Sequence, residues 1–244
     1  MKKIYALIGL MFVGTAINAQ HQKDTSKLII NARTSLGIKF GVTESNLRGD
    51  NLDSLSVNGM SSSLQGIHVG IVVNSKTGKH FWLKHELLVN QKGANITRND
   101  KSAGNYNSSL KTWALDLYPI SPTLQYKGLQ LYAGPYVSAL LDASIQKKNS
   151  AGELVNDHTI FGSGYNNQSQ SKYLQKFDYG FNIGVEYEFS FGLNLGIKYT
   201  KGFSEILDNA NSITVGKLTD PTRIKIYSEF VNFSVGYSIM RGNK

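Results

Sequence analysis

The chain has 244 residues, with no Cys, 4 Pro, 24 Gly, 13 Tyr and 11 Phe, and a formal net charge of +9. The lack of Cys excludes a disulfide framework and Cys-based zinc or redox sites, and the glycine and aromatic content favours strands and turns over helices. The positive charge is spread along the chain without the clustered basic stripe of a nucleic-acid-binding surface, so we expect no nucleic-acid partner.

The first 19 residues have the pattern of a secretory signal peptide. Lys2 and Lys3 precede an apolar run at 4–13, and Ala19 offers a cleavage position. The apolar run is short for a membrane-spanning helix, and an uncleaved anchor is the weaker alternative. No later apolar run is long enough to span as a helix. We therefore expect an exported chain that can enter a membrane only as a closed β-barrel.

Eight later segments alternate apolar and polar residues with a period of two, as strands with one apolar face do. In the clearest segment, 177–189, every odd-numbered residue is large and apolar, and every even-numbered residue is Asp, Asn, Glu or Gly. In chain order the predicted strands are 35–42, 66–73, 81–93, 113–126, 129–143, 177–189, 193–200 and 229–239.

Two places interrupt this alternation. Pro119 and Pro122 disturb the fourth predicted strand and indicate either a β-bulge or an early strand end. His85 falls among the apolar positions of the third predicted strand, which indicates the membrane boundary or a local break in register.

The connections between the predicted strands alternate strictly between long and short. The short ones lie near Lys76, Lys127 and Ser190. The long, polar ones are 46–61, 93–108, 148–175 and 205–224. This alternation is typical of outer-membrane barrels, which have short periplasmic turns and longer outer loops.

The sequence therefore predicts an all-β protein, an eight-stranded antiparallel up-and-down transmembrane β-barrel, with both termini on the periplasmic side. The expected organisation is a signal peptide at 1–19, a short periplasmic segment at 20–32, the outer membrane β-barrel at 33–240 and a C-terminal tail at 241–244.

The polar strand faces carry most of the strand glycines and a set of ionisable residues. The interior of an eight-stranded barrel is just wide enough for side chains, so we place the polar face inside and the apolar face against lipid. A soluble ligand-binding barrel of lipocalin type has the opposite arrangement and is the alternative. The predicted interior polar residues are Lys39, His68, Lys84, Glu86, Asp116, Asp142, Asp178, Glu186, Glu188 and Lys198.

A buried charge must be paired or it costs several kcal/mol, so these residues predict a network of salt bridges that plugs the barrel. Glu86 is the carboxylate expected to pair first. Its candidate partners are Lys39, Lys84 and Lys198. The alternative is a proton or ion path, or a hydrolytic site that uses His68 with a carboxylate. The histidines have no zinc-binding spacing, so we expect no metal site and no cofactor.

Four stretches, 86–95, 131–143, 177–189 and 196–206, resemble the outer membrane protein β-barrel family that includes PorT-like proteins. The first contains Glu-Leu-Leu-Val-Asn-Gln-Lys-Gly-Ala, and the second contains Ala-Gly-Pro-Tyr. The resemblance covers most of the exported chain. It implies an outer-membrane location in a Gram-negative bacterium, a porin-like fold, and, from one member of the family, an association with protein secretion machinery.

We expect a structural or interaction protein and no enzyme. Outer membrane lipids would surround the barrel, and a protein partner or ligand would bind the long loops, 148–175 above all, or the periplasmic turns. A membrane-embedded lipid-modifying enzyme is the rival interpretation, and it would need a His, a Ser and an acidic residue together at one rim. A narrow channel is disfavoured, because the lumen of eight strands should be filled by side chains.

Overall fold

The computed structural model describes residues 34–100, 104–161, 174–207 and 224–240. The predicted signal peptide at 1–19, the segment at 20–32 and the tail at 241–244 lie outside the described residues. Within the described part of the chain, no helix has the length and apolarity needed to cross a membrane. The strands are β1 Thr34–Arg48, β2 Ser61–Ser62, β3 Leu64–Lys76, β4 Phe81–Asp100, β5 Gly104–Tyr126, β6 Leu129–Lys148, β7 Leu154–Asp157, β8 Phe177–Glu188, β9 Leu193–Gly202 and β10 Tyr227–Met240.

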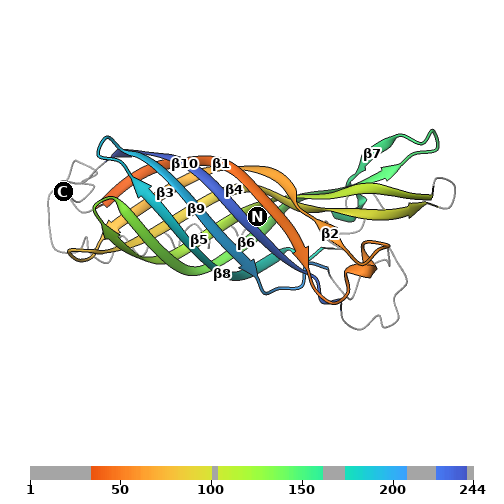
Figure 1. Cartoon of the computed structure of the whole chain (residues 1–244), viewed down its shortest axis with the longest axis horizontal. Coiled ribbons are helices and arrows are strands. Elements are labelled where there is room, and N and C mark those ends of the chain that lie inside the picture. The colour runs from red at the N-terminus through yellow and green to blue at the C-terminus, as the bar shows by residue number, and fades with distance from the viewer. Residues whose placement is uncertain (1–33, 101–103, 162–173, 208–223, 241–244) are drawn as a thin grey trace, which may run out of the picture.

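Eight of these strands close into a ring (Figure 1). The order around the ring is β4-β3-β1-β10-β9-β8-β6-β5, and β5 pairs back onto β4. The pairing of β1 with β10 joins the first strand to the last, so no long strand keeps an open edge within the ring. The short strands β2 and β7 pair with β4 and β6 outside the ring. The predicted eight-stranded antiparallel barrel is confirmed.

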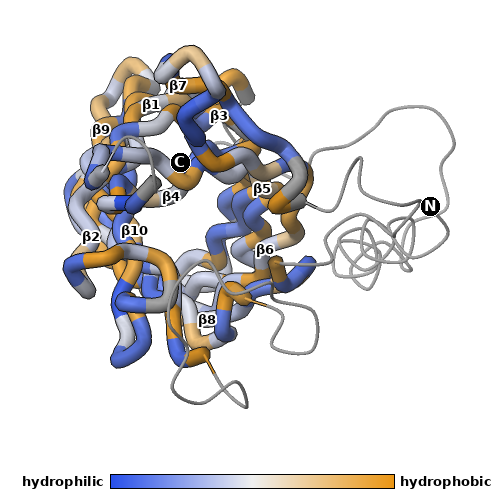
Figure 2. Tube along the Cα trace, turned by 90° about the vertical axis from the view of Figure 1, so that its right-hand side faces the viewer, coloured by the Kyte–Doolittle hydropathy of each residue, from blue (hydrophilic) through white to orange (hydrophobic). Residues whose placement is uncertain are grey.

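The two faces of the ring differ as the period-two pattern predicted. Hydrophobic and hydrophilic residues alternate along the strands in Figure 2. In β1, Ile38 and Phe40 are 45% and 55% exposed, while Lys39 between them is 1% exposed. The large apolar side chains therefore cover the outside of the barrel and the polar ones fill its interior. This arrangement is that of a membrane barrel, and it excludes the alternative of a lipocalin-like soluble barrel.

Both predicted irregularities lie where β4, β5 and β6 meet. The β5 strand runs through the two prolines to Tyr126, and its pairing with β6 is interrupted between Leu117 and Thr123 and resumes beyond. The proline region is therefore a bulge, and the alternative of an early strand end is wrong. The register of β4 against β5 also shifts between Lys84 and Glu86, so His85 marks a true break in register.

A further bulge overturns the predicted interior position of Asp142. On β6, Leu140 pairs with Ala114 and Asp142 with Trp113, which leaves one extra residue between them. An extra residue reverses the parity of the strand beyond it. Asp142 therefore lies on the outer side of the sheet, where its side chain is 44% exposed and contacts His158.

The predicted loop at 93–108 is also wrong. The described residues of this range, 93–100 and 104–108, belong to β4 and β5. The range 46–61 likewise contains the end of β1 and the 3-10 helix η1 Leu52–Ser54, and the range 148–175 contains β7 and the 3-10 helix η2 His158–Phe161. The range 205–224 lies mostly outside the described residues.

The reason for this difference is the position of the membrane boundary. The outward-facing apolar band ends at Glu44 on β1, Gln91 on β4 and Lys111 on β5, and the strands continue beyond it. Beyond the band the outer face of the sheet is in water, so its outward-facing residues are polar. A strand of this kind has the same polar composition as a loop, and the sequence pattern does not distinguish the two. The short turns lie at the opposite, left-hand end in Figure 1.

We expect Gly41→Ala to destabilise the barrel by about 1–3 kcal/mol, the usual range for overpacking. A Cβ at Gly41 would lie 1.9 Å from the carbonyl oxygen of Phe233 and 2.9 Å from Cε1 of His68, so β1 could not keep its distance from β10. The measurement is the urea midpoint of the refolded protein in lipid vesicles. Gly78→Ala is the control, because its nearest neighbour would be Cβ of Phe81 at 3.6 Å. Equal midpoints for the two variants would contradict this account of close strand packing.

Candidate functional site

Five charged side chains meet at the centre of the barrel, and we call them the central ion network: Lys39, Lys84, Glu86, Glu186 and Lys198. Glu86 accepts a hydrogen bond from Lys39 Nζ at 2.5 Å through Oε1 and from Lys198 Nζ at 2.5 Å through Oε2. Oε2 of Glu186 accepts from Lys39 at 2.7 Å and from Lys84 at 3.0 Å. All five side chains are almost completely buried. The network links β1, β4, β8 and β9.

Aromatic rings complete the surroundings of these lysines. Nζ of Lys198 lies 3.3 Å from the centroid of the Tyr118 ring, and Nζ of Lys84 lies 4.2 Å from that of Tyr132. The network has three ammonium groups and two carboxylates, so salt bridges alone leave one positive charge in excess. The electron-rich faces of the two tyrosines add to the stabilisation of Lys198 and Lys84, each of which has only one carboxylate partner among the described residues.

Asp116 lies in a neighbouring cluster with Lys92, a residue that the sequence reasoning missed. Lys92 Nζ donates to Oδ1 of Asp116 at 2.7 Å, and Ser138 Oγ donates to the same oxygen at 2.6 Å. Asn90 Nδ2 donates to Oδ2 at 2.9 Å. Lys92 occupies an even-numbered position of β4, in phase with Lys84 and Glu86, so strand parity alone could have identified it.

His68 makes its hydrogen bonds to uncharged side chains. Its Nδ1 is 3.0 Å from Oγ1 of Thr43 and 3.2 Å from Nδ2 of Asn232, and its Nε2 is 2.9 Å from Oγ of Ser234. Thr43 in turn donates to Oδ1 of Asn90 at 2.7 Å. Because no carboxylate is among its hydrogen-bond partners in the described part of the chain, His68 has the surroundings of a packed polar residue rather than of a general base.

Asp178 and Glu188 lie away from the central ion network, toward opposite ends of the barrel. Asp178 accepts hydrogen bonds from the hydroxyl of Tyr136, from Ser228 Oγ at 2.7 Å and from the backbone N–H of Ser204 at 3.3 Å. The carboxylate of Glu188 accepts from Nε2 of Gln130 at 3.1 Å. Among the described residues, no group of three or more His, Asp or Glu is placed to hold a metal ion.

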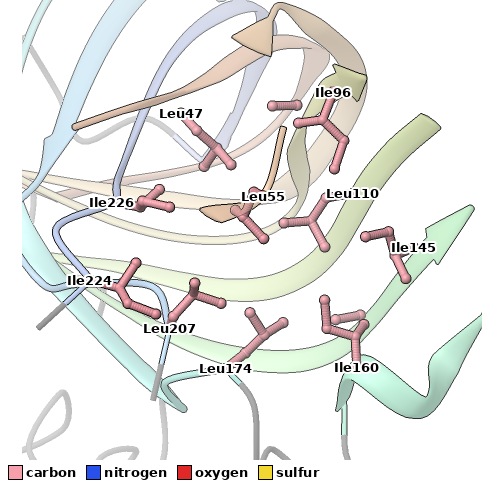
Figure 3. Packing of buried hydrophobic residues seen from close by; sticks show 12 residues of the cluster. Leu47, Leu55, Ile96, Leu110, Ile145, Ile160, Leu174, Leu207, Ile224 and Ile226 are labelled. Atoms are coloured by element: carbon pink, nitrogen blue, oxygen red, sulfur yellow. The ribbon is translucent and has the colours of Figure 1, made fainter. Parts of the chain in front are cut away.

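Above the polar interior, the outer end of the barrel is closed by apolar side chains, a feature that the sequence reasoning missed. These side chains come from β1, β4, β5, β6 and the connecting segments and point toward one another (Figure 3). This outer apolar cluster consists of Leu47, Leu55, Ala94, Ile96, Leu110, Ala143, Ile145, Ile160, Leu174, Leu207, Ile224 and Ile226. The barrel is therefore filled by charges at its centre and by a small hydrophobic core at its outer mouth.

A cavity of about 70 Å³ separates these two parts of the interior. Leu47 and Leu110 line it on the outer side, and Lys92, Asp178 and Phe230 line it on the inner side. The cavity is far smaller than the roughly 300–1,000 Å³ of pockets that hold drug-sized ligands. This cavity therefore offers no room for a substrate of that size.

Comparison with known proteins gives a family match. The family model described as "Outer membrane protein beta-barrel domain" matches residues 18–208, which is more than half of the chain. No curated protein matches the sequence.

Several solved structures share the barrel architecture. Neisserial surface protein A is 10% identical, with a TM-score of 0.46, and the match covers 84% of this chain and 99% of that one. Ail, the attachment invasion locus protein of Yersinia pestis, is 9% identical, with a TM-score of 0.41 and coverage of 84% and 98%. OprG from Pseudomonas aeruginosa is 10% identical, with a TM-score of 0.40 and coverage of 84% and 95%. These identities are too low to transfer a function.

We expect Glu86→Gln to lower the free energy of unfolding by about 3–5 kcal/mol, the usual effect of removing one partner of a buried ion pair. The change leaves Lys198 without a carboxylate and Lys39 with only one. Urea midpoints in lipid vesicles would measure the effect. Glu153→Gln, at an exposed position, is the control and should shift the stability by less than about 0.5 kcal/mol. Lys198→Met added to Glu86→Gln should recover part of the loss, because the unpaired charge is gone. If the double variant unfolded at a lower urea concentration than Glu86→Gln alone, the pairing of Glu86 with Lys198 would be contradicted.

Proposed function

From the premise that the chain belongs to the outer membrane protein β-barrel domain family and lies in the outer membrane, we propose that it is a closed barrel. We propose further that its outer end binds a partner at the cell surface. Two observations support closure. The central ion network joins four strands across the lumen, and the outer apolar cluster fills the mouth above it. A conducting barrel needs a continuous water path, which paired charges and packed aliphatic side chains both oppose.

The observation that carries the proposal is the extension of the sheet beyond the membrane. Residues 93–100, 104–110 and 143–148 continue β4, β5 and β6 past the outward-facing apolar band, with β2 and β7 at the two edges. We call this part the outer head (right-hand end in Figure 1). A sheet packed on its own core presents a rigid surface. Such a surface loses less conformational entropy on binding than flexible loops would.

Exposed apolar side chains on the outer head indicate where a partner would bind. Leu154 and Val155 of β7 are exposed at one edge, and Val57 and Met60 are exposed near the other. These residues lie outside the lipid-facing band, so lipid does not cover them. Exposed apolar groups that neither lipid nor core covers are typical of protein-binding surfaces. Within the described residues β7 pairs with β6 alone, so its other edge offers a place for an extended segment of a partner to add as a strand.

We propose no enzymatic activity. A lipid-modifying enzyme would need a histidine with a serine and a carboxylate at one rim, whereas His68 lies inside the barrel among Thr43, Asn232 and Ser234. His158 and Asp142 do meet at the outer boundary, with 3.2 Å between Nδ1 and Oδ1, but both side chains are exposed to water, whereas catalytic groups usually lie in a cleft.

A narrower proposal concerns protein secretion. The resemblance of 86–95 and 131–143 to PorT-like proteins supports a place beside secretion machinery, which would contact the barrel through its outer head or through the periplasmic turns. The turns at 77–80, 127–128 and 189–192 are short and offer little surface. We therefore place the partner at the outer head.

Site-specific photocrosslinking in intact cells tests the side on which the partner binds. We expect a photoreactive residue at Asn156 of β7 to give a discrete crosslinked product, and one at Lys79 of the β3–β4 turn to give none. Val155→Asp should weaken the product at position 156, because it places a charge in the apolar contact. Products from position 79 alone would place the partner in the periplasm and refute the proposal for the outer head.

Conductance in planar bilayers tests closure. We expect no discrete conductance steps from the purified protein at moderate voltage, because the lumen is filled at two levels. Insertion would be verified by protease protection of the same sample. Stable steps from verified, inserted barrels would overturn the closed state and favour a channel.

A further inference from the structure

The turn between β5 and β6 has a backbone conformation that its sequence does not favour. Its two central residues, Lys127 and Gly128, have φ angles of 47° and 90°. Positive φ at both positions defines a type I′ hairpin turn, in which Asn-Gly is strongly preferred. Lys127 is the one non-glycine residue with positive φ in the described part of the chain. A lysine that is kept in an unfavourable conformation suggests that its side chain is used.

The side chain of Lys127 has no protein carboxylate to pair with in the described part of the chain. Instead its Nζ lies 5.3 Å from the centroid of the Tyr126 ring. Tyr126 is the last residue of β5, faces outward and is 61% exposed. An exposed cation–π contact stabilises an ammonium group only weakly, so Lys127 keeps most of its capacity to bind an anion.

A second turn brings a further cation, Lys79, and the imidazole of His80 to the same place. The ring of His80, in the β3–β4 turn, lies 5.8 Å from that of Tyr126. The N–H of Gln125 donates to the carbonyl oxygen of His80 at 2.8 Å, which holds the two turns together. Lys79 precedes His80 and is exposed. Glu188, whose N–H donates to the carbonyl oxygen of Gly128 in the β5–β6 turn, directs its carboxylate inward to Gln130.

Below these cations the wall of the barrel is apolar. Leu124 and Leu129 lead away from the turn on the outward face, and both are exposed. Phe81, also outward and exposed, flanks them on β4. The site therefore combines cations at the periplasmic membrane boundary with a surface for an acyl chain directly beneath them. A tyrosine at such a boundary sits at the level of lipid head groups.

We propose that Lys127, with His80 and Lys79, binds the phosphate of an anionic phospholipid in the periplasmic leaflet of the outer membrane. The apolar wall distinguishes this ligand from a free phosphate, which would gain nothing from Leu124 and Leu129. The inference is independent of the partner at the outer head, because the two sites lie at opposite ends of the barrel.

Native mass spectrometry of the full, detergent-extracted barrel tests the site. The probes are phosphatidylglycerol and phosphatidylcholine with the same acyl chains. We expect selective retention of phosphatidylglycerol by the wild type and by Lys127→Arg, and retention about fivefold weaker in Lys127→Asn, as for the loss of one basic residue near a membrane surface. Because Asn suits a type I′ turn, Lys127→Asn should be at least as stable as the wild type in urea.

Lys148→Asn is the matched control, because it also removes a lysine held 5.3 Å from a tyrosine ring, that of Tyr106, but in the outer head. It should leave lipid retention unchanged. Equal retention of the two lipids by the wild type, or unchanged retention in Lys127→Asn, would overturn the proposal. Displacement of the lipid by millimolar glycerol phosphate would show that a phosphate without acyl chains suffices, and would equally overturn the assignment to a lipid. A less stable Lys127→Asn would refute the argument from turn conformation.

Discussion

The pairing of every backbone group within a medium that contains no water is the constraint on which this structure depends. A sheet meets it only by closing, so β10 must return to β1, and the strands in between must each pair on both sides. Closure with eight strands leaves an interior with little room. Glycines such as Gly41 follow from that restriction, because a Cβ there would meet the neighbouring strand.

The narrow interior in turn determines how its charges are arranged. Lysines that reach into a space without bulk water must each find a carboxylate or an aromatic face. Lys39 does so by bridging Glu86 and Glu186, residues 47 and 147 positions away in the chain. Such contacts tie together strands that share no hairpin. The same contacts fill the lumen, so stability and the proposed closed state have one cause, and the proposed binding surface lies at the outer end.

The outer head shows that the surrounding medium, lipid or water, determines which side chains face the interior of the sheet. Within the bilayer the apolar side chains face outward and the charges face inward. Past Gln91 and Lys111 the outside of the sheet meets water, and the interior at that level is the outer apolar cluster. One bulge, beside Leu141, turns Ala143 and Ile145 inward where β6 enters this second environment. The barrel thus carries a small sheet with one face in water, and this is the part to which we propose that a partner binds.

By itself, the sequence determined the number of strands in the ring, the two faces of these strands and the positions of the short turns. These properties follow from the alternation of apolar and polar residues and from the residues that form tight turns. Both signals depend only on residues that are close together in the chain. Only the tertiary structure decided that 93–100 and 104–108 are strands, because a strand with one face in water is as polar as a loop. It alone placed Asp142 outside, since the bulge beside Leu141 depends on the register of β6 against β5 and, unlike the one at the prolines, has no sign in the sequence. It also decided which lysine meets which carboxylate, because such pairs form across the lumen between strands that are distant in the chain.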